Sequence, residues 1–367
     1  MSSRRSWLKQ TSLAFVSLGI VPLESFAIPK TENSINEETN LNPIRLRSNE
    51  NPYGPSALAR DAMSKNINSS NRYNWDLTSE LISKIAEKNN LVAENIILGA
   101  GSTEILDLVA RYCAINKGSF ILADPTFNYW TEIAEKLGLK KITVPLTEDK
   151  HHDLSAMLKA IEPDTRMIYI CNPNNPTGTI CEREALVNFI NEATKKVIVL
   201  VDEAYIDFTN QKSLVNLVKE NKNLIIAKTF SKMYGLAGAR IGYGIANSGT
   251  IEKISQLQSW SNGSVSVASV SGALASIKDD KFVSETYLLN EKARKYTIEQ
   301  LERLKIRCIP SHSNFVYFSL ANYNKDFFER LEKNNITGTK IYEENGKWSR
   351  ITIGTMKEMQ QFIKVLE

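Results

Sequence analysis

Histidine is scarce in this sequence, and its scarcity excludes several kinds of active site. Only His151, His152 and His312 are present in 367 residues. A metal centre built from several histidines is therefore not expected. A serine hydrolase would need one of these three residues beside its nucleophile, but no Gly-x-Ser-x-Gly turn accompanies them. The sequence thus points away from both kinds of enzyme.

Cysteine is also sparse, and neither positive nor negative charge predominates. The four cysteines, at positions 113, 171, 181 and 308, include no close pair, and this spacing is typical of neither a disulfide framework nor a zinc site. Cys113 and Cys171 stand in apolar surroundings, so we expect buried thiols there. The formal net charge is +4, which gives no indication of a nucleic-acid-binding surface.

The chain lacks a hydrophobic run long enough to span a membrane. Its N-terminal apolar stretch, 13–21, ends at Pro22, whereas a spanning helix needs about 20 apolar residues. The basic segment SRRSWLK (3–9) precedes this stretch, and Ser25-Phe26-Ala27 follows it. This order resembles a bacterial twin-arginine signal. We therefore expect residues 1–27 to be an export signal peptide and the protein to be periplasmic or otherwise exported. The alternative is a basic tail on a cytoplasmic protein.

The rest of the sequence predicts an α/β protein with two domains. After a polar N-terminal arm over 28–55, helix-length amphipathic stretches alternate with short apolar runs such as Phe120–Ala123, Met167–Cys171, Val197–Val201 and Leu224–Ala227. Such alternation is typical of a mostly parallel sheet covered by helices on both faces. We expect this large domain to span 56–275. A smaller α+β domain is expected over 276–367, where a long helix precedes mixed short strands and helices.

Polar residues stand where several of the predicted strands end, and ligands collect at these ends in open α/β sheets. Ser102 and Thr103 follow Gly101 at the start of a helix, where free N–H groups can hold an anion. An ordinary helix N-cap is the alternative interpretation. Asn175 lies in the loop NNPTG (174–178), which a simple turn would also explain.

Asp202 and Lys232 are the most informative of these polar residues. Asp202 ends the apolar run VIVLVD (197–202), so its carboxylate is expected at the carboxyl edge of the sheet unless it only caps a helix. Lys232 follows the run LIIAKTFS (224–231) and precedes small and apolar residues. A lone lysine is normally a solvated surface charge, but a partly buried lysine has a lowered pKa and can act as a nucleophile.

The ordered set of segments resembles the fold-type I, pyridoxal-phosphate-dependent aminotransferases, and within them most closely the histidinol-phosphate aminotransferase family. The resemblance covers about residue 43 to the end. It is carried by the segments NENPYGPS (49–56), GSTE (101–104), NNPTG (174–178), DEAY (202–205), TFSK (229–232) and RITIGT (350–355). It implies an aspartate-aminotransferase-like fold and transaminase activity with pyridoxal 5′-phosphate.

The resemblance assigns catalytic roles to three residues. Lys232 would form the Schiff base with the cofactor aldehyde and then move the substrate proton. Asp202 would pair with the pyridine nitrogen and keep it protonated, so that the ring acts as an electron sink. Tyr205, together with Asn175, would bond to the phenolic oxygen of the ring.

The resemblance also assigns binding roles. Trp130 would stack on the cofactor ring, although a core aromatic on a helix explains it too. Arg350 would clamp the substrate α-carboxylate, with Asn175 beside it. Tyr73 would reach the phosphate site of a neighbouring subunit, which implies a homodimer. The cofactor phosphate would be held by Ser102, Thr103, Thr229, Ser231 and Arg240.

Two departures from the family leave the substrate open. Lys340 is the nearest cation where family members often carry an arginine, and Arg47 stands where small or amide residues are common. The expected reaction transfers an amino group between an amino acid or amino-alcohol phosphate and a 2-oxo acid. Because histidinol phosphate is a cytoplasmic intermediate, an exported enzyme would act on amino acids, including aromatic or other bulky ones. The alternatives are a decarboxylase of the phosphothreonine type and a non-catalytic amino-acid-binding module.

Overall fold

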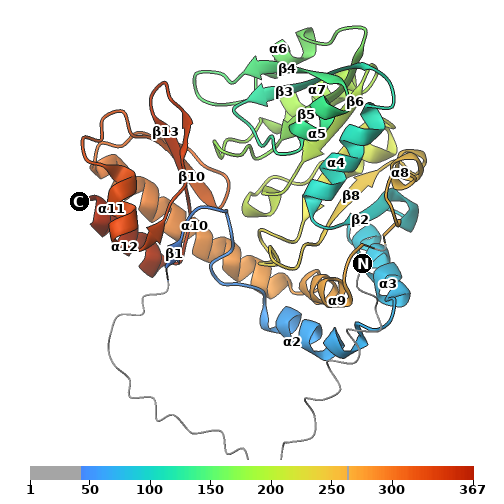
Figure 1. Ribbon diagram of the computed structural model, residues 1–367, viewed down its shortest axis with the longest axis horizontal. Helices are drawn as coiled ribbons and strands as arrows, with labels where there is room; N and C mark the ends of the chain where they lie inside the picture. Colours follow the sequence, from blue (N-terminus) through green and yellow to red (C-terminus); the bar gives the residue numbers. More distant parts are fainter. Residues whose placement is uncertain (1–42, 263) are drawn as a thin grey trace, which may run out of the picture. The chain divides into compact units, whose positions relative to one another are not determined.

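In the computed structural model, a seven-stranded sheet forms the core of the larger part of the chain, and helices cover it (Figure 1). Strands β4, β3, β5, β6 and β7 run parallel, and β8 is antiparallel to both of its neighbours. The predicted α/β architecture with a mostly parallel sheet is confirmed. In sheet order the strands are β2 (Ile96–Gly99), β8 (Gly242–Ala246), β7 (Leu224–Thr229), β6 (Ile198–Asp202), β5 (Thr165–Cys171), β3 (Gly118–Asp124) and β4 (Leu139–Pro145).

The strands of this sheet are apolar along their length because both of its faces are buried. Successive side chains of a strand point to opposite faces, so Val199 and Val201 join one core cluster and Leu200 joins the other. The first cluster includes residues of α3 (Trp75–Lys88), α6 (Leu154–Lys159), α7 (Arg183–Ala193) and α9 (Val267–Ser276). The second includes residues of α4 (Ser102–Cys113), α5 (Thr131–Lys136) and α8 (Ser248–Ser255). Helix α2 (Ala57–Asn66) packs on α9.

A smaller antiparallel sheet belongs to the C-terminal part, as expected. In sheet order its strands are β12 (Ile341–Glu343), β13 (Trp348–Thr352), β10 (Phe315–Ser319) and β9 (Cys308–Ile309). The helices of this part are α10 (Asp280–Arg303), α11 (Phe327–Lys333) and α12 (Met356–Leu366). Strand β1 (Ile44–Arg45) pairs in parallel with β11 (Ile336–Thr337). Ile44 and Leu46 are buried in the same C-terminal core, so the end of the predicted N-terminal arm is part of it.

The structure describes residues 43–262 and 264–367. The predicted export signal at 1–27 lies outside these residues, as does the first part of the predicted arm. Within the described ranges, no helix is long and apolar enough to cross a membrane. Cys113 and Cys171 are buried free thiols, as predicted.

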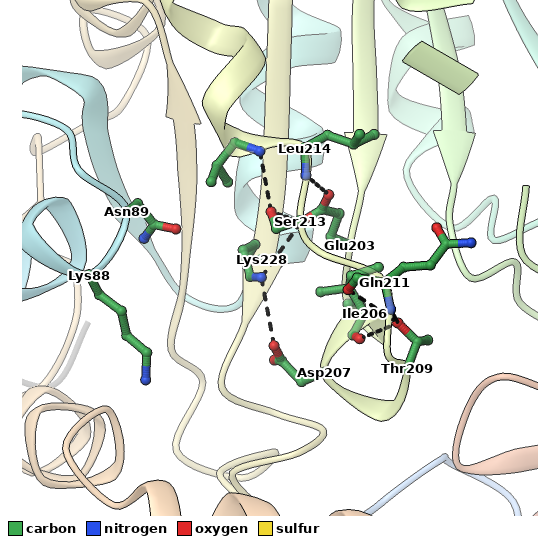
Figure 2. Close-up of polar contacts among 12 residues, drawn as sticks. Lys88, Asn89, Glu203, Ile206, Asp207, Thr209, Gln211, Ser213, Leu214 and Lys228 are labelled. Atoms are coloured by element: carbon green, nitrogen blue, oxygen red, sulfur yellow. Dashed lines mark hydrogen bonds and ion pairs between the residues drawn. The ribbon is translucent and has the colours of Figure 1, made fainter. Parts of the chain in front are cut away.

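A buried ion cluster joins the ends of strands β6 and β7 (Figure 2). The Nζ atom of Lys228 lies 3.6 Å from Glu203 Oε2 and 3.8 Å from Asp207 Oδ1. Glu203 also accepts hydrogen bonds from the Leu214 N–H, at 2.8 Å, and from the Ser213 hydroxyl. Burial alone lowers the pKa of Lys228, but the charges of Asp207 and Glu203 outweigh burial and hold this pKa above its ordinary value. The lysine therefore stays charged.

This cluster gives a prediction for stability. Replacing Lys228 with Met leaves the Glu203 carboxylate, which is 1% exposed, buried without its counter-charge. We expect the free energy of unfolding, measured by urea denaturation, to fall by about 3–5 kcal/mol. Lys195→Met is the control, because the Lys195–Glu192 pair is exposed and such pairs contribute at most about 1 kcal/mol. Equal losses in the two variants would contradict the prediction.

Candidate active site

Ten of the twelve residues predicted to form the site line one cavity of about 740 Å³. The cavity lies where β3, β5, β6 and β7 end, because the last residues of these strands and the loops after them carry most of its lining. The other two predicted residues, Trp130 and Tyr73, are not part of the lining. The ten lining residues are Ser102, Thr103, Asn175, Asp202, Tyr205, Thr229, Ser231, Lys232, Arg240 and Arg350.

Asp202 is the buried acid of the cavity. It ends β6 and is 2% exposed. Its Oδ2 accepts a hydrogen bond from the Tyr169 hydroxyl at 3.1 Å, and its Oδ1 accepts one from the Ala204 N–H at 3.0 Å. Burial raises the pKa of Asp202 to about 6, although both hydrogen bonds oppose this rise. A cationic ligand group beside the carboxylate would therefore favour its charged form.

Lys232 provides an amine with a lowered pKa. Its Nζ donates a hydrogen bond to the Ser48 carbonyl at 3.0 Å. Burial, followed by the positive charge of Arg350, lowers the pKa of Lys232 to about 8. A substantial fraction of the amine is therefore neutral near physiological pH, and the neutral amine is the form that attacks a carbonyl group.

Arg350 presents an incompletely bonded guanidinium group. It is 6% exposed on strand β13, and it donates to Asn175 Oδ1 and, at 2.6 Å, to the Arg47 carbonyl. The rings of Phe315 and Tyr342 each lie 5.3 Å from its central carbon. Among the described residues, no hydrogen-bond partner reaches its buried Nε atom. A carboxylate or phosphate ligand would supply that partner.

Hydroxyl groups and N–H groups gather in the cavity where helix α4 begins and strand β7 ends. Ser102 begins helix α4, whose first N–H groups are free to bind an anion. Thr229 donates to the Ser231 hydroxyl at 2.9 Å, and Arg240 approaches the same hydroxyl at 3.3 Å. Gly101 precedes the helix with φ of 85°, and a Cβ atom there would lie 2.4 Å from Arg240. The left-handed backbone at position 101 therefore favours glycine, and a side chain there would displace the Arg240 guanidinium group.

The structure places an aromatic residue other than Trp130 against the cavity. Trp130 is 3% exposed, and its ring packs 5.3 Å from Phe120 and 5.1 Å from Tyr169. Trp130 therefore occupies a core position, which was the alternative interpretation of this residue in the sequence. Phe127 and Tyr129 line the cavity instead. Neither residue was expected at the site, although both stand beside Trp130 in the segment PTFNYW (125–130).

Three further placements bear on substrate and assembly. Arg47 and Lys340, the two cations that depart from the family pattern, are among the residues that line the cavity. Tyr73 is 68% exposed and stacks on Trp75, at 5.5 Å between ring centroids. Its predicted role at a neighbouring subunit remains a prediction.

The polar groups of the cavity fit pyridoxal 5′-phosphate. The start of α4 and Arg240 suit a phosphate, Asp202 suits a protonated ring nitrogen, and the Lys232 amine suits an aldehyde. The buried Nε atom of Arg350 then remains for a substrate anion. No group of three or more histidine, cysteine or acidic side chains in the described ranges could hold a metal ion.

The lowered pKa of Lys232 gives a second prediction. The rate at which cofactor-free protein takes up pyridoxal phosphate should rise with pH through a midpoint near 8, because the neutral amine reacts. An ordinary lysine would place this midpoint at about 10.4. Arg350→Met removes a positive charge, so it should move the midpoint upward. Stopped-flow measurement of the visible absorbance checks both statements.

The controls for this measurement use the same absorbance. Lys232→Ala should show no yellow cofactor band at any pH. Lys340→Ala should keep the band, because Lys340 lines the cavity but is none of the residues that would hold the cofactor. A midpoint near 10 in the unmodified protein would contradict the proposed environment of the amine.

Comparison with known proteins agrees with this geometry. The chain matches the class I and II aminotransferase family over residues 42–366. It is 36% identical over 329 residues to the histidinol-phosphate aminotransferase of Moorella thermoacetica, covering 88% of this chain and 84% of that protein.

Solved structures share the fold. The histidinol-phosphate aminotransferase of Sinorhizobium meliloti in complex with pyridoxal-5′-phosphate has a TM-score of 0.81 at 24% identity and covers 88% of this chain and 90% of that one. The aspartate aminotransferase of Thermus thermophilus with maleate has a TM-score of 0.77 at 17% identity, with the same coverage of each chain. The chain therefore belongs to the class I and II aminotransferases, and it is a pyridoxal-phosphate-dependent transaminase.

Proposed function

We propose that this transaminase moves an amino group between a donor with two anionic groups and a 2-oxo acid, with Lys232 as the lysine bonded to the cofactor. Amino acids with an acidic side chain are such donors. An amino-alcohol phosphate is an alternative that carries its charge on the phosphate. The observation that carries the proposal is that one cavity holds Lys232, Asp202 and Arg350 together with two unassigned cations, Arg47 and Lys340.

The residues divide the chemical work between them. The bound cofactor supplies an electron sink for the bond that breaks at the substrate Cα. Asp202 would accept a hydrogen bond from the protonated ring nitrogen, and its negative charge would keep the proton on that nitrogen. The Lys232 amine, with its lowered pKa, removes the proton from Cα and returns it during the transfer. Arg350 binds the substrate carboxylate or phosphate through its Nε–H group and one terminal N–H group of the guanidinium.

Arg47 and Lys340 support the choice of an anionic side chain. Neither side chain has a salt bridge or hydrogen bond to another described residue, and Lys340 only lies 5.6 Å from the Tyr342 ring centroid. Two unpaired cations attract a negative group on the substrate. No observation on the cavity or among the relatives favours decarboxylation.

A donor panel with 2-oxoglutarate as acceptor tests the proposal. We expect glutamate to form with histidinol phosphate or with acidic amino acids faster than with aromatic or aliphatic ones. Arg350→Ala should lower kcat/KM for all donors by about 100-fold, because charge-assisted hydrogen bonds are lost. Arg47→Ala should raise KM by about 10-fold only for donors with a second anionic group. Carbon dioxide without glutamate, or fastest turnover of aromatic donors, would contradict the proposal.

We further propose a homodimer in which Tyr73 contributes to the partner's phosphate site. An exposed cluster of Tyr73, Trp75 and Trp260 supports it: the ring centroids lie 4.9 to 5.6 Å apart, and the three residues are 44% to 68% exposed. Contiguous exposed aromatic groups are typical of protein–protein contacts.

Sedimentation and cofactor titration test the dimer together. Trp260→Glu should give monomers and weaken the binding of pyridoxal phosphate, because a buried charge opposes association. Tyr73→Phe should leave the dimer intact and weaken cofactor binding by about 10-fold, the effect of one lost hydrogen bond to a charged group. Leu288→Glu, at another exposed apolar residue, is the control and should change neither. A monomeric unmodified protein that binds the cofactor tightly would contradict the dimer.

A further inference from the structure

The segment Arg47–Asn51 connects the main groups of the cavity through its backbone carbonyls and its asparagine side chains. The Ser48 carbonyl accepts a hydrogen bond from the Lys232 amine at 3.0 Å, and the Arg47 carbonyl accepts one from Arg350 at 2.6 Å. Further along, Asn51 Nδ2 donates to the Met233 carbonyl at 2.7 Å. Asn49, between these residues, bonds to Tyr205, and this hydrogen bond bears most directly on the cofactor site.

Asn49 links the C-terminal sheet to Tyr205. It is 1% exposed, and its N–H donates to the Thr352 hydroxyl at 2.9 Å. The Thr352 hydroxyl in turn donates to Asn49 Oδ1 at 3.1 Å. This pairing holds Oδ1 toward Thr352, so the Nδ2 group points to Tyr205 and donates to its Oη atom at 3.0 Å.

A second amide reaches the same Tyr205 oxygen. Asn175 Nδ2 lies 3.4 Å from Tyr205 Oη. Arg350 fixes the orientation of the Asn175 side-chain amide. Arg350 donates a hydrogen bond to Asn175 Oδ1, and a guanidinium group cannot accept one from the Nδ2 group. The Tyr205 oxygen therefore receives two N–H donors, which occupy its two lone pairs.

The Tyr205 hydroxyl also carries a proton that it can donate in a hydrogen bond. No acceptor for this proton occurs among the described residues, and Tyr205 lines the cavity. The ring itself is held edge-on against Phe315, with 5.0 Å between centroids. With both lone pairs engaged and the ring fixed, the direction left for the O–H bond is into the cavity.

We propose that Asn49 is a positioning residue that makes Tyr205 a hydrogen-bond donor toward the phenolic oxygen of the bound cofactor. A hydroxyl free to rotate could instead accept from that oxygen when the oxygen is protonated. The two amide donors remove this alternative, so the bond is always donated toward the cofactor. The proposal rests on the cofactor assignment and adds to it a role for the segment NENP (49–52).

The backbone of Asn49 explains which residues can replace it. Its φ of 53° lies in the left-handed region, which asparagine, aspartate and glycine tolerate best. Glycine keeps this conformation but removes the amide. Aspartate also keeps it, but its carboxylate only accepts hydrogen bonds, so it would draw the Tyr205 proton to itself and away from the cavity.

The test measures the pH midpoint of the visible absorbance of the cofactor-loaded enzyme. A hydrogen bond donated to the phenolic oxygen stabilises its negative form, so loss of this bond raises the midpoint. Asn49→Gly should raise it by roughly 0.5 to 1 pH unit. Asn49→Asp should raise it as much as Tyr205→Phe does, because both variants remove the donor. In the Tyr205→Phe background, Asn49→Gly should add no further shift.

Controls separate this role from a general loss of stability. Asn95 is a buried amide remote from the cavity that donates to the Ala246 carbonyl at 2.8 Å. Asn95→Gly should lower the melting temperature and leave the absorbance midpoint unchanged. An unchanged midpoint in Asn49→Gly, or a shift that persists in the Tyr205→Phe background, would overturn the proposal. Absence of a visible band in the unmodified enzyme would instead contradict the cofactor assignment.

Discussion

The register of three adjacent parallel strands is the constraint on which the site depends. Asp202 at the end of β6 pairs with Cys171 of β5 on one side and with Ala227 of β7 on the other. The loops that carry Asn175 and Lys232 therefore leave the sheet beside the buried carboxylate. Because a slip of one residue would turn each strand's side chains to the opposite face, this register decides whether acid and amine share one cavity.

Burial then gives both groups the properties that the chemistry needs. It raises the pKa of Asp202 to about 6 and lowers that of Lys232 to about 8, since a low-dielectric environment disfavours either charge. A cofactor with a cationic ring nitrogen and a reactive aldehyde satisfies both residues at once. The ion cluster around Lys228 keeps the ends of β6 and β7 joined behind them. Stability and reactivity thus come from neighbouring positions of the same two strands.

The segment before α2 completes the cavity from outside the sheet. Its backbone carbonyls receive hydrogen bonds from Lys232 and Arg350, and Asn49 bonds to Tyr205 and to Thr352. A few residues near the start of the described chain thereby hold side chains that are 156 to 303 positions away. Such contacts connect the large sheet and the C-terminal sheet at the edge of the cavity.

The sequence by itself determined the fold class, because short apolar runs predict a buried parallel sheet, and its resemblance to the aminotransferases indicated ten of the residues that line the cavity. It did not determine which aromatic residue faces the cavity. Phe127 and Trp130 lie three residues apart, and the turn before α5 decides that Phe127 lines it while Trp130 enters the core. Nor did it reveal the contacts of Asn49. Those contacts depend on residues far apart in the chain, and only the packing of the two sheets brings them within hydrogen-bonding distance.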